Sequence, residues 1–265
     1  MVLAAQRTVY VIVHTLLRCR GGYDRIVCCC DLSERLKWME QRLPMLKRLF
    51  SVEHDRNGVE LLVCFATEGE GSMLTPQLRC KTSIVALRTG VGMVNAAHAV
   101  SCFIARRHVG LIVVCGVGGA YPGSGLSVGQ VVCASLECYA DLGAMTPNGF
   151  VGMQALGLPI VETAQPLYNT LPISVFPVER RVPFATVACL TGTDEAARSL
   201  ALRTGCAVEN MEGAAIAHVA HLHAIPVGEV RAISNPVGDR KPDDWRLQDA
   251  TLLAQEALLS WIESR

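Results

Sequence analysis

From residue 58 onward, the chain alternates apolar runs with helical patterns, and each run ends in glycine or a polar residue. The clearest runs cover residues 60–65, 83–88, 111–115 and 227–234. Near-continuous apolar runs of this length predict strands that are buried on both faces. The pattern therefore predicts an α/β domain in which helices cover both faces of a sheet.

The residues that follow these runs predict where a ligand binds. Right-handed crossovers bring the ends of parallel strands to one edge of a sheet, and ligands bind outside their carboxyl ends. We therefore expect one cleft, lined by Glu70, Gly90 to Gly92, Gly116 to Ala120 and Asn235. The proline-containing segment from Pro159 to Pro183 is expected to form a surface excursion or lid.

The first part of the chain follows a different pattern. Between residues 32 and 50, apolar residues such as Leu36, Met39 and Leu43 recur at helical spacing. Asn57 and Gly58 form a turn signal, after which a strand is expected from Val59. We predict an N-terminal extension over residues 1–57 and one domain over residues 58–265.

Composition narrows the class of partner. Of the 265 residues, 51% are hydrophobic and 18% are charged, and the formal net charge is zero. Such a chain is globular and lacks the basic excess of a nucleic-acid-binding protein. No apolar run approaches the ~20 residues that a membrane span needs. A small molecule is the expected partner, with neither nucleic acid nor a membrane.

The twelve cysteines do not indicate a disulfide framework. No C-x-x-C pair occurs, and four cysteines fall inside apolar, strand-like runs, where a thiol packs as a small hydrophobe. This usage favours a reducing cytoplasm. The triplet at residues 28–30 could bind a metal, but its spacing fits no common zinc pattern. The four strand-like cysteines are Cys64, Cys115, Cys133 and Cys189.

Two polar residues at the ends of these elements could hold a nucleoside. Glu212 opens a helix rich in small residues, where a carboxylate either stabilises the helix dipole or accepts hydrogen bonds from a vicinal diol. Asn235 ends a strand before Pro236, so it is either an ordinary turn residue or an amide that donates to and accepts from the edge of a 6-oxopurine. The residues alone leave both pairs of alternatives open.

Other candidate groups give weaker signals. Glu70 and Glu68 lie in the first loop, either as solvated acids or as a general base for water. The glycine run at 116–119 lacks the third glycine of a dinucleotide loop, and no P-loop or serine-hydrolase elbow occurs. His218 and His221 share a helix face, which fits a metal site less well than an ordinary surface.

Several motifs together resemble the purine nucleosidase/phosphorylase superfamily. Residues 211–215 read Met-Glu-Gly-Ala-Ala and residues 231–235 read Arg-Ala-Ile-Ser-Asn. The runs at 118–125, 139–143 and 191–194, together with Trp245, are similar to the futalosine hydrolases in particular. The resemblance spans about residues 60–262. It implies a three-layer phosphorylase/hydrolase-like fold with a central twisted mixed sheet flanked by helices.

The resemblance also implies roles for individual residues. Glu70, the last acid of the first loop, matches the glutamate that activates water, although the flanking glycines would loosen it. Glu212 matches the ribose-binding glutamate, and Asn235 takes the catalytic base-recognition position. The remaining substrate-binding residues that it implies are Met211 against the sugar, Gly119 and Ala120 beside the base, and Thr191 and Thr193 in the base pocket.

The activity implied by the resemblance is hydrolysis of the N-glycosidic bond of futalosine to hypoxanthine and dehypoxanthine futalosine, in menaquinone biosynthesis. It implies no metal or organic cofactor, and a homo-oligomer built on dimers. The alternatives are a methylthioadenosine/S-adenosylhomocysteine nucleosidase, another purine nucleosidase or phosphorylase, and a non-catalytic nucleoside-binding module. Asn235 disfavours the first, since those nucleosidases usually carry Asp there. A phosphorylase would need an arginine-bearing phosphate cradle, for which Arg88 and Arg231 are the candidates.

Overall fold

The structure, a computed structural model, describes residues 55–239 and 245–265. The predicted extension over residues 1–57 and the cysteine triplet therefore lie outside the described residues, except for residues 55–57. The strands are β1 Asp55–Val59, β2 Leu61–Phe65, β3 Ile84–Arg88, β4 Arg107–Val109, β5 Ile112–Ala120, β6 Val131–Tyr139, β7 Gly143–Thr146, β8 Gly149–Gly152, β9 Thr170–Pro172, β10 Arg181–Thr186, β11 Val208–Asn210 and β12 Val227–Pro236. The helices are η1 Gly69–Gly71, α3 Leu74–Leu78, α4 Met93–Ile104, α5 Met153–Leu156, α6 Asp194–Thr204, α7 Gly213–Leu222 and α8 Leu247–Glu263.

A mixed sheet forms the centre of the domain, in the strand order β11-β10-β6-β12-β5-β2-β3. The pairs β3–β2, β2–β5 and β5–β12 are parallel, whereas β12 pairs with β6 antiparallel. β11 also pairs antiparallel with β5. The carboxyl ends of β2, β5 and β12 therefore lie at one edge, which confirms the α/β class and the parallel core of the sheet.

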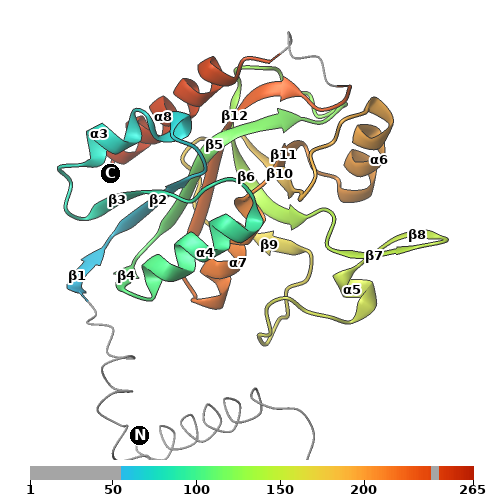
Figure 1. Cartoon of the computed structure of the whole chain (residues 1–265), viewed down its shortest axis with the longest axis horizontal. Helices are drawn as coiled ribbons and strands as arrows, with labels where there is room; N and C mark the ends of the chain where they lie inside the picture. The colour runs from blue at the N-terminus through green and yellow to red at the C-terminus, as the bar shows by residue number, and fades with distance from the viewer. Residues whose placement is uncertain (1–54, 240–244) are drawn as a thin grey trace, which may run out of the picture. The chain divides into compact units, whose positions relative to one another are not determined.

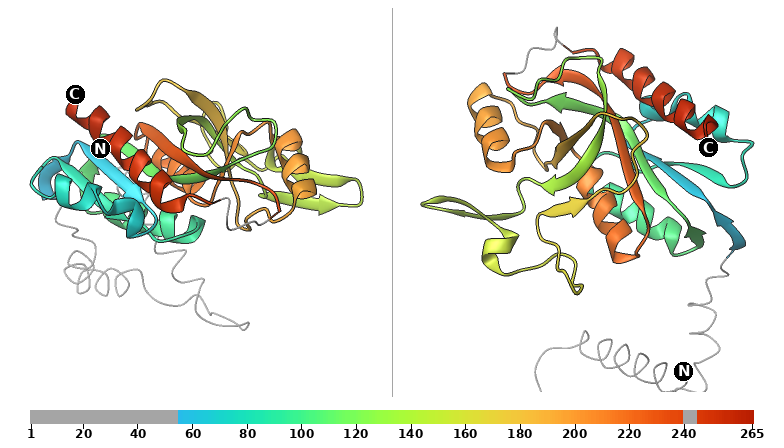
Figure 2. Two further views of the ribbon diagram at one scale, coloured as in Figure 1. Left: turned by 90° about the horizontal axis from the view of Figure 1, so that it is seen from above. Right: turned by 180° about the vertical axis from the view of Figure 1, so that it is seen from behind.

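Helices cover the sheet on both faces, as Figures 1 and 2 show. α3 and α8 lie on one face, and α4 and α7 pack together on the other. β2 shows why the sequence requires this arrangement. Leu61, Val63 and Phe65 pack into the cluster that includes α8, while Leu62 and Cys64 pack into the cluster with α4 and α7. The run is apolar throughout because both of its faces are buried.

Three local predictions are wrong. The turn expected at Asn57 and Gly58 lies inside β1, which begins at Asp55. The glycines at 116–119 continue β5 instead of forming a loop. Cys189 is exposed and lies outside the strands, whereas Cys64, Cys115 and Cys133 are buried in them.

The segment from Pro159 to Pro183 also differs from the expected excursion. It contains β9, which pairs antiparallel with β6, and the first residues of β10. Leu171 is completely buried and joins the core that contains α7. The segment contributes to the sheet and supplies none of the residues that line the cavity described below.

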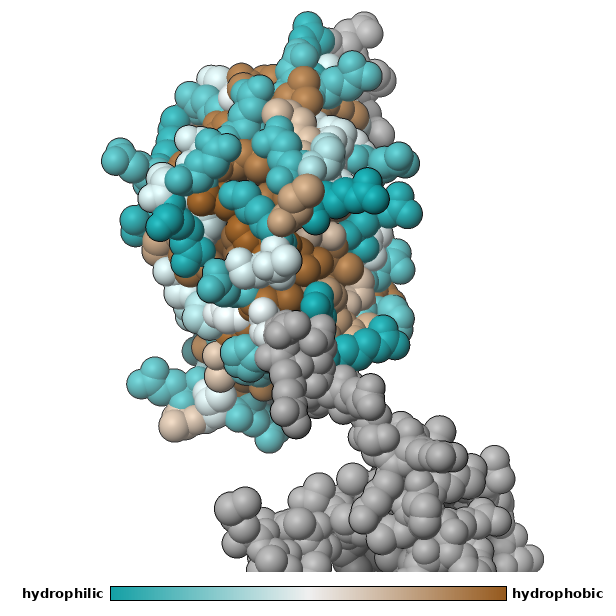
Figure 3. All heavy atoms as spheres, turned by 90° about the vertical axis from the view of Figure 1, so that its left-hand side faces the viewer, coloured by the Kyte–Doolittle hydropathy of each residue, from teal (hydrophilic) through white to brown (hydrophobic). Residues whose placement is uncertain are grey.

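One side of the surface is seen in Figure 3, where hydrophilic side chains alternate with smaller hydrophobic areas. Among the residues that the structure describes, no helix is long and apolar enough to cross a membrane.

Candidate active site

A cavity opens where β5, β11 and β12 end, at the edge of the sheet that the sequence indicates. Val117 to Gly119, Glu209 and Asn210, and Ser234 to Pro236 line it from these three strands. Side chains from the loops after β2 and β3 complete the wall. Of the predicted site residues, it brings together Glu70, Gly119, Thr191, Met211, Glu212 and Asn235.

Two predicted residues lie outside this cavity. The Thr193 hydroxyl accepts a hydrogen bond from the Ala196 N–H at 3.2 Å and caps the N-terminus of α6. Ala120 lines a separate hollow over the loop that follows β5. Neither residue lines this cavity, so the predicted positions of Ala120 beside the base and of Thr193 in the base pocket stay predictions.

Glu70 sits in η1 with only 6% of its surface exposed. Its Oε2 accepts hydrogen bonds from the N–H and the hydroxyl of Thr67, both at 2.9 Å, and its Oε1 accepts one from the Val117 N–H at 3.1 Å. Glu68, by contrast, is exposed and lies 3.9 Å from Arg88. The position therefore favours Glu70 over Glu68.

The glycines beside Glu70 do not loosen it. A Cβ on Gly71 would lie 2.1 Å from the Phe65 ring, so only glycine allows η1 to pack this closely on β2. Three accepted hydrogen bonds hold the Glu70 carboxylate in one orientation. The expectation of a loosened base is wrong because the small residue serves close packing.

Glu212 occupies the N-cap position of α7, but its side chain does not cap the helix. Its Oε1 accepts a hydrogen bond from the Gly92 N–H at 3.0 Å, which ties it to the loop after β3. Asn210 performs the capping, since its Oδ1 accepts from the N–H groups of Glu212 and Gly213 at 3.0 and 2.8 Å. Glu212 is thus free of a capping role, and its carboxylate lines the cavity.

Burial raises the pKa of Glu212, while Arg231 and the Gly92 N–H act in the opposite direction. The net pKa lies above the ordinary glutamate range. An isolated buried carboxylate would be strongly disfavoured, so its nearby cation is necessary for the ionised form.

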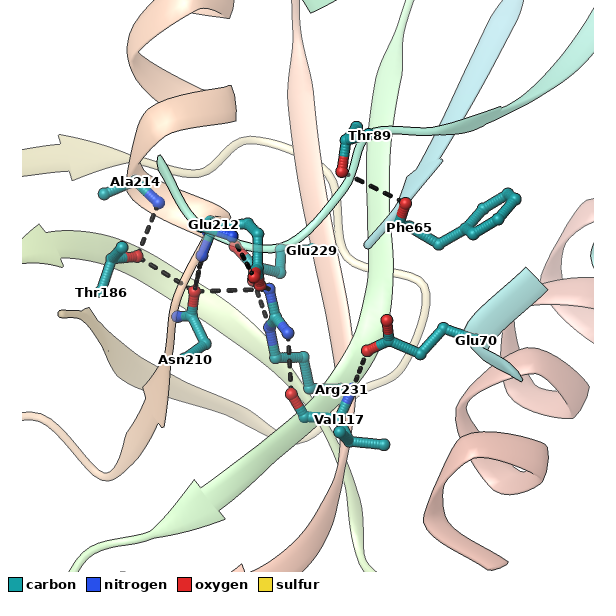
Figure 4. A network of polar contacts seen from close by, with 12 residues as sticks. Phe65, Glu70, Thr89, Val117, Thr186, Asn210, Glu212, Ala214, Glu229 and Arg231 are labelled. Carbon is teal, nitrogen blue, oxygen red and sulfur yellow. Dashed lines mark hydrogen bonds and ion pairs between the residues drawn. The ribbon is translucent and has the colours of Figure 1, made fainter. Parts of the chain in front are cut away.

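Arg231 lines the cavity, and Figure 4 shows its guanidinium bonded to Glu229, Val117 and Glu212. Its Nε donates to Glu229 at 2.6 Å, its Nη1 donates to the Val117 carbonyl at 2.7 Å, and its Nη2 lies 3.4 Å from Glu212. Burial lowers the pKa of Arg231, but the neighbouring carboxylates raise it by more than burial lowers it. The net pKa is therefore raised, and the guanidinium remains charged. Two carboxylates therefore already compensate this cation.

A pair of fully buried carboxyl groups lies behind Arg231. A Cβ on Gly213 would lie 2.2 Å from Oε1 of Glu137 and 2.4 Å from Oε2 of Glu229, so both oxygens meet at this glycine. Burial, together with Glu229, raises the pKa of Glu137 well above its usual range. The raised pKa favours the protonated form of Glu137, whose O–H can donate to Oε2 of Glu229; among the described residues this oxygen has no other hydrogen-bond partner.

The amide of Asn235 has a defined orientation. Its Nδ2 donates to the Pro236 carbonyl and its Oδ1 accepts from the Ser234 hydroxyl, both at 2.8 Å. Because a carbonyl can only accept, the atom beside Pro236 must be the nitrogen. One N–H of this amide is left to face a ligand.

The histidines are engaged in other contacts. His218 donates from Nε2 to the Ile160 carbonyl at 2.9 Å and contacts the Tyr139 hydroxyl through Nδ1. His221 Nε2 binds the Pro172 carbonyl. Within residues 55–239 and 245–265, no group of three or more His, Cys, Asp or Glu residues is arranged to hold a metal ion.

Comparison with known proteins shows which family the chain resembles. The family model of the phosphorylase superfamily matches residues 25–262. A futalosine hydrolase from Thermus thermophilus is 36% identical over 178 residues, which cover 64% of this chain and 76% of that protein. A futalosine hydrolase from Streptomyces coelicolor is 34% identical over 180 residues, covering 65% of this chain and 75% of the relative.

The chain belongs to the phosphorylase superfamily and, within it, to the futalosine hydrolase family.

Solved structures show the same fold. A Helicobacter pylori methylthioadenosine/S-adenosylhomocysteine nucleosidase, a mutant with 5'-methylthioadenosine in its active site, matches with a TM-score of 0.66 and 14% identity, over 78% of this chain and 100% of that one. The native futalosine hydrolase of Helicobacter pylori matches with a TM-score of 0.65 and 14% identity, over 78% of this chain and 98% of that one. At this identity the likeness concerns the fold, which confirms the phosphorylase-like architecture.

Three residues that support the site, Glu137, Glu229 and Asn210, were not predicted from the sequence, and Arg231 was named only as a candidate phosphate ligand. Glu229 and Arg231 lie two residues apart inside an apolar strand, and Glu137 lies in another. Charged side chains in buried strands must be paired. Charged residues within these apolar runs are therefore the signal in the sequence that could have indicated a buried polar network. Asn210 carried no such signal, since its role as the cap of α7 depends on the approach of β11 to that helix.

Proposed function

We propose that this chain hydrolyses the N-glycosidic bond of futalosine, releasing hypoxanthine and dehypoxanthine futalosine as a step of menaquinone biosynthesis. The observation that carries the proposal is one cavity that holds Glu70, Glu212 and Asn235, in a chain whose relatives of 34–36% identity are futalosine hydrolases. Each group suits one part of a nucleoside.

Glu212 is the proposed ribose-binding residue, with Met211 beside it. Its carboxylate uses one lone pair for the Gly92 N–H and retains others that can accept the 2'- and 3'-hydroxyls. Cleavage of the glycosidic bond passes through an oxocarbenium-like sugar, and a carboxylate on these hydroxyls stabilises that charge. Arg231 supports the ionised form of Glu212.

Glu70 is the proposed general base. Its carboxylate is oriented by Thr67 and Val117, and it lies near Arg231 across the bare Cα of Gly116. An oriented carboxylate of this kind can align water and accept its proton.

Asn235 is the proposed group that stabilises the leaving base. Its free N–H can donate to N7 or O6 of a 6-oxopurine as negative charge develops there. The amide has no acidic proton to transfer, so the proton on the released base comes from water or from tautomers of the base.

Hydrolysis is favoured over phosphorolysis by the charge of the cavity wall. Among the described residues that line the cavity, Arg231 is the one cation, whereas Glu70, Glu209, Glu212 and Asp239 are acids. Because Arg231 already pairs with two carboxylates, a phosphate dianion would meet uncompensated negative charge. Arg88, the other candidate, is more than half exposed and lies 3.9 Å from Glu68.

We also infer a homo-oligomer built on dimers and a cytoplasmic location. Val94 is 83% exposed at the start of α4, and Val91 lines the cavity and is 49% exposed, which supports an apolar contact near the site. All eight cysteines in the described part of the chain are free thiols, as expected in a reducing compartment. Light scattering of the purified chain tests the oligomeric state.

The function is tested by incubating the chain separately with futalosine, inosine, methylthioadenosine and S-adenosylhomocysteine, and by following free base. Hypoxanthine from futalosine, with little turnover of the other three, is the expected result. Adenine release at a comparable or higher rate would instead assign the chain to the methylthioadenosine/S-adenosylhomocysteine nucleosidases. No base release from any of them would favour a binding module.

A further inference from the structure

Glu209 is a buried carboxylate in the cavity wall that has no role in the reaction described above. It is 4% exposed and lies on β11. Its Oε1 accepts a hydrogen bond from the Thr191 N–H at 3.0 Å, and its Oε2 accepts from the Tyr121 hydroxyl at 2.7 Å and from the Thr191 hydroxyl. Burial and the nearby Glu209 raise the pKa of Tyr121, so this phenol keeps its proton and donates.

The sheet places Glu209 across from Asn235. Glu209 on β11 pairs with Gly119 of β5, and Asn235 on β12 pairs with the same glycine from the other side. Residues opposite one another on neighbouring strands project to the same face of a sheet. Gly119 has no side chain, and a Cβ there would lie 3.2 Å from the Asn235 Nδ2. The same Cβ would lie 2.6 Å from Cγ2 of Val237, so only glycine fits here, between Asn235 on one neighbouring strand and Glu209 on the other.

The two strands beside Gly119 offer different hydrogen-bonding groups to the cavity. Asn235 presents an N–H. Thr191 has one N–H and one O–H, and Glu209 takes both, so the Thr191 hydroxyl can only accept from a ligand. The wall formed by Glu209 and Thr191 is therefore built of acceptors.

This arrangement distinguishes two classes of purine. A 6-oxopurine has a donor at N1 beside acceptors at O6 and N7, which complements an acceptor wall next to the Asn235 N–H. A 6-aminopurine in the same orientation sets its bare N1 acceptor against this acceptor wall and its amino donor against the Asn235 N–H, so both contacts are mismatched. Such unpaired polar contacts in a buried site give strong discrimination.

We propose that Glu209 determines base specificity, by holding Thr191 as a hydrogen-bond acceptor and so requiring a purine that carries a proton on N1. The inference rests on the proposed function, because it assumes that the cavity binds the purine of a nucleoside.

The test measures binding of hypoxanthine and of adenine to the full chain by calorimetry, and compares the ratio of the two dissociation constants. In the Glu209→Gln variant an amide N–H can donate to Thr191, which frees the Thr191 hydroxyl to turn its proton toward the ligand. The preference for hypoxanthine over adenine is expected to fall by at least about tenfold, the value of one hydrogen bond. Glu68→Gln, the same change at an exposed acid outside the cavity, leaves the ratio unchanged.

If Glu209 has a purely structural role, Glu209→Gln weakens the binding of hypoxanthine and of adenine equally. An unchanged ratio of the two dissociation constants in this variant overturns the proposal. If that variant does not fold, Thr191→Val removes the acceptor from a half-buried loop position, and the ratio must again fall. Wild-type chain that releases hypoxanthine from futalosine but binds adenine as tightly as hypoxanthine overturns this inference alone. Wild-type chain that neither releases hypoxanthine nor binds it overturns the proposed function as well.

Discussion

The substitution Gly116→Ala tests whether the space between Glu70 and Arg231 matters for the reaction. A Cβ at this position would lie 2.6 Å from Oε1 of Glu70 and 2.9 Å from Nη1 of Arg231. Ordinary contact begins at 3.4 Å, so the carboxylate must move by about 0.8 Å. Three hydrogen bonds hold Glu70 and the Val117 carbonyl holds Arg231, so neither can move without losing a partner.

The size of the effect follows from this displacement. A shift of about 1 Å in a reacting group costs on the order of 100-fold in rate, which corresponds to about 2.7 kcal/mol in the activation barrier. Because the methyl group meets the proposed water-activating residue and not the base-binding wall, the loss should fall mainly on kcat. KM for futalosine should change by less than about threefold.

The assay is steady-state release of hypoxanthine from futalosine, with thermal unfolding recorded in parallel. Gly69→Ala is the matched control, because it places the same methyl group beside Glu70, where the nearest atom lies 3.9 Å away. Its kcat should stay close to that of the wild type. Equal kcat values in Gly116→Ala and wild-type chain, with both folded, would refute the assigned geometry of Glu70.

Three further predictions concern other parts of the site. Glu212→Gln keeps the size of the side chain and removes its charge, so kcat/KM for futalosine should fall on the order of 100-fold as two charge-assisted hydrogen bonds weaken; undiminished turnover would rule out the ribose role. Thr193→Ala should lower the free energy of unfolding by about 1 kcal/mol through loss of the α6 cap and leave kcat/KM unchanged; a loss of activity in the folded variant would place Thr193 in the site after all. The raised pKa of Glu137 means that its stabilising contribution is complete below its unfolded pKa and is lost as pH rises through its folded value. The melting temperature of Glu137→Gln should therefore fall less than that of the wild type as pH rises above the ordinary glutamate pKa of 4.5, and parallel curves would contradict the raised pKa.

Much of the sheet was predictable because its strands are buried on both faces. The runs that became β2 and the first half of β5 carry apolar side chains at consecutive, fully buried positions, and this pattern does not depend on distant contacts. Gly116 to Gly119 misled the prediction, since glycine is most often a loop residue. Here it extends β5, because the side chains of Glu70, Arg231 and Val237 occupy the space that a Cβ would need.

The site was predictable in part for a similar reason. Glu70, Glu212 and Asn235 follow strand ends or open a helix, so topology alone brings them to one edge. The supporting residues depend on contacts between elements far apart in the chain. Glu137 and Glu229, for instance, meet at Gly213 only because β6, β12 and α7 converge there. No local pattern in the sequence specifies that convergence.

Glu70 and its surroundings are proposed to deliver water to the ribose of futalosine. The most direct measurement is the reaction of futalosine in ¹⁸O-labelled water containing inorganic phosphate, with mass spectrometry of both products. If Glu70 activates water, free hypoxanthine and a sugar product that carries one ¹⁸O atom are expected, at a rate independent of phosphate. A sugar phosphate without the label, formed only when phosphate is present, would contradict this role of Glu70.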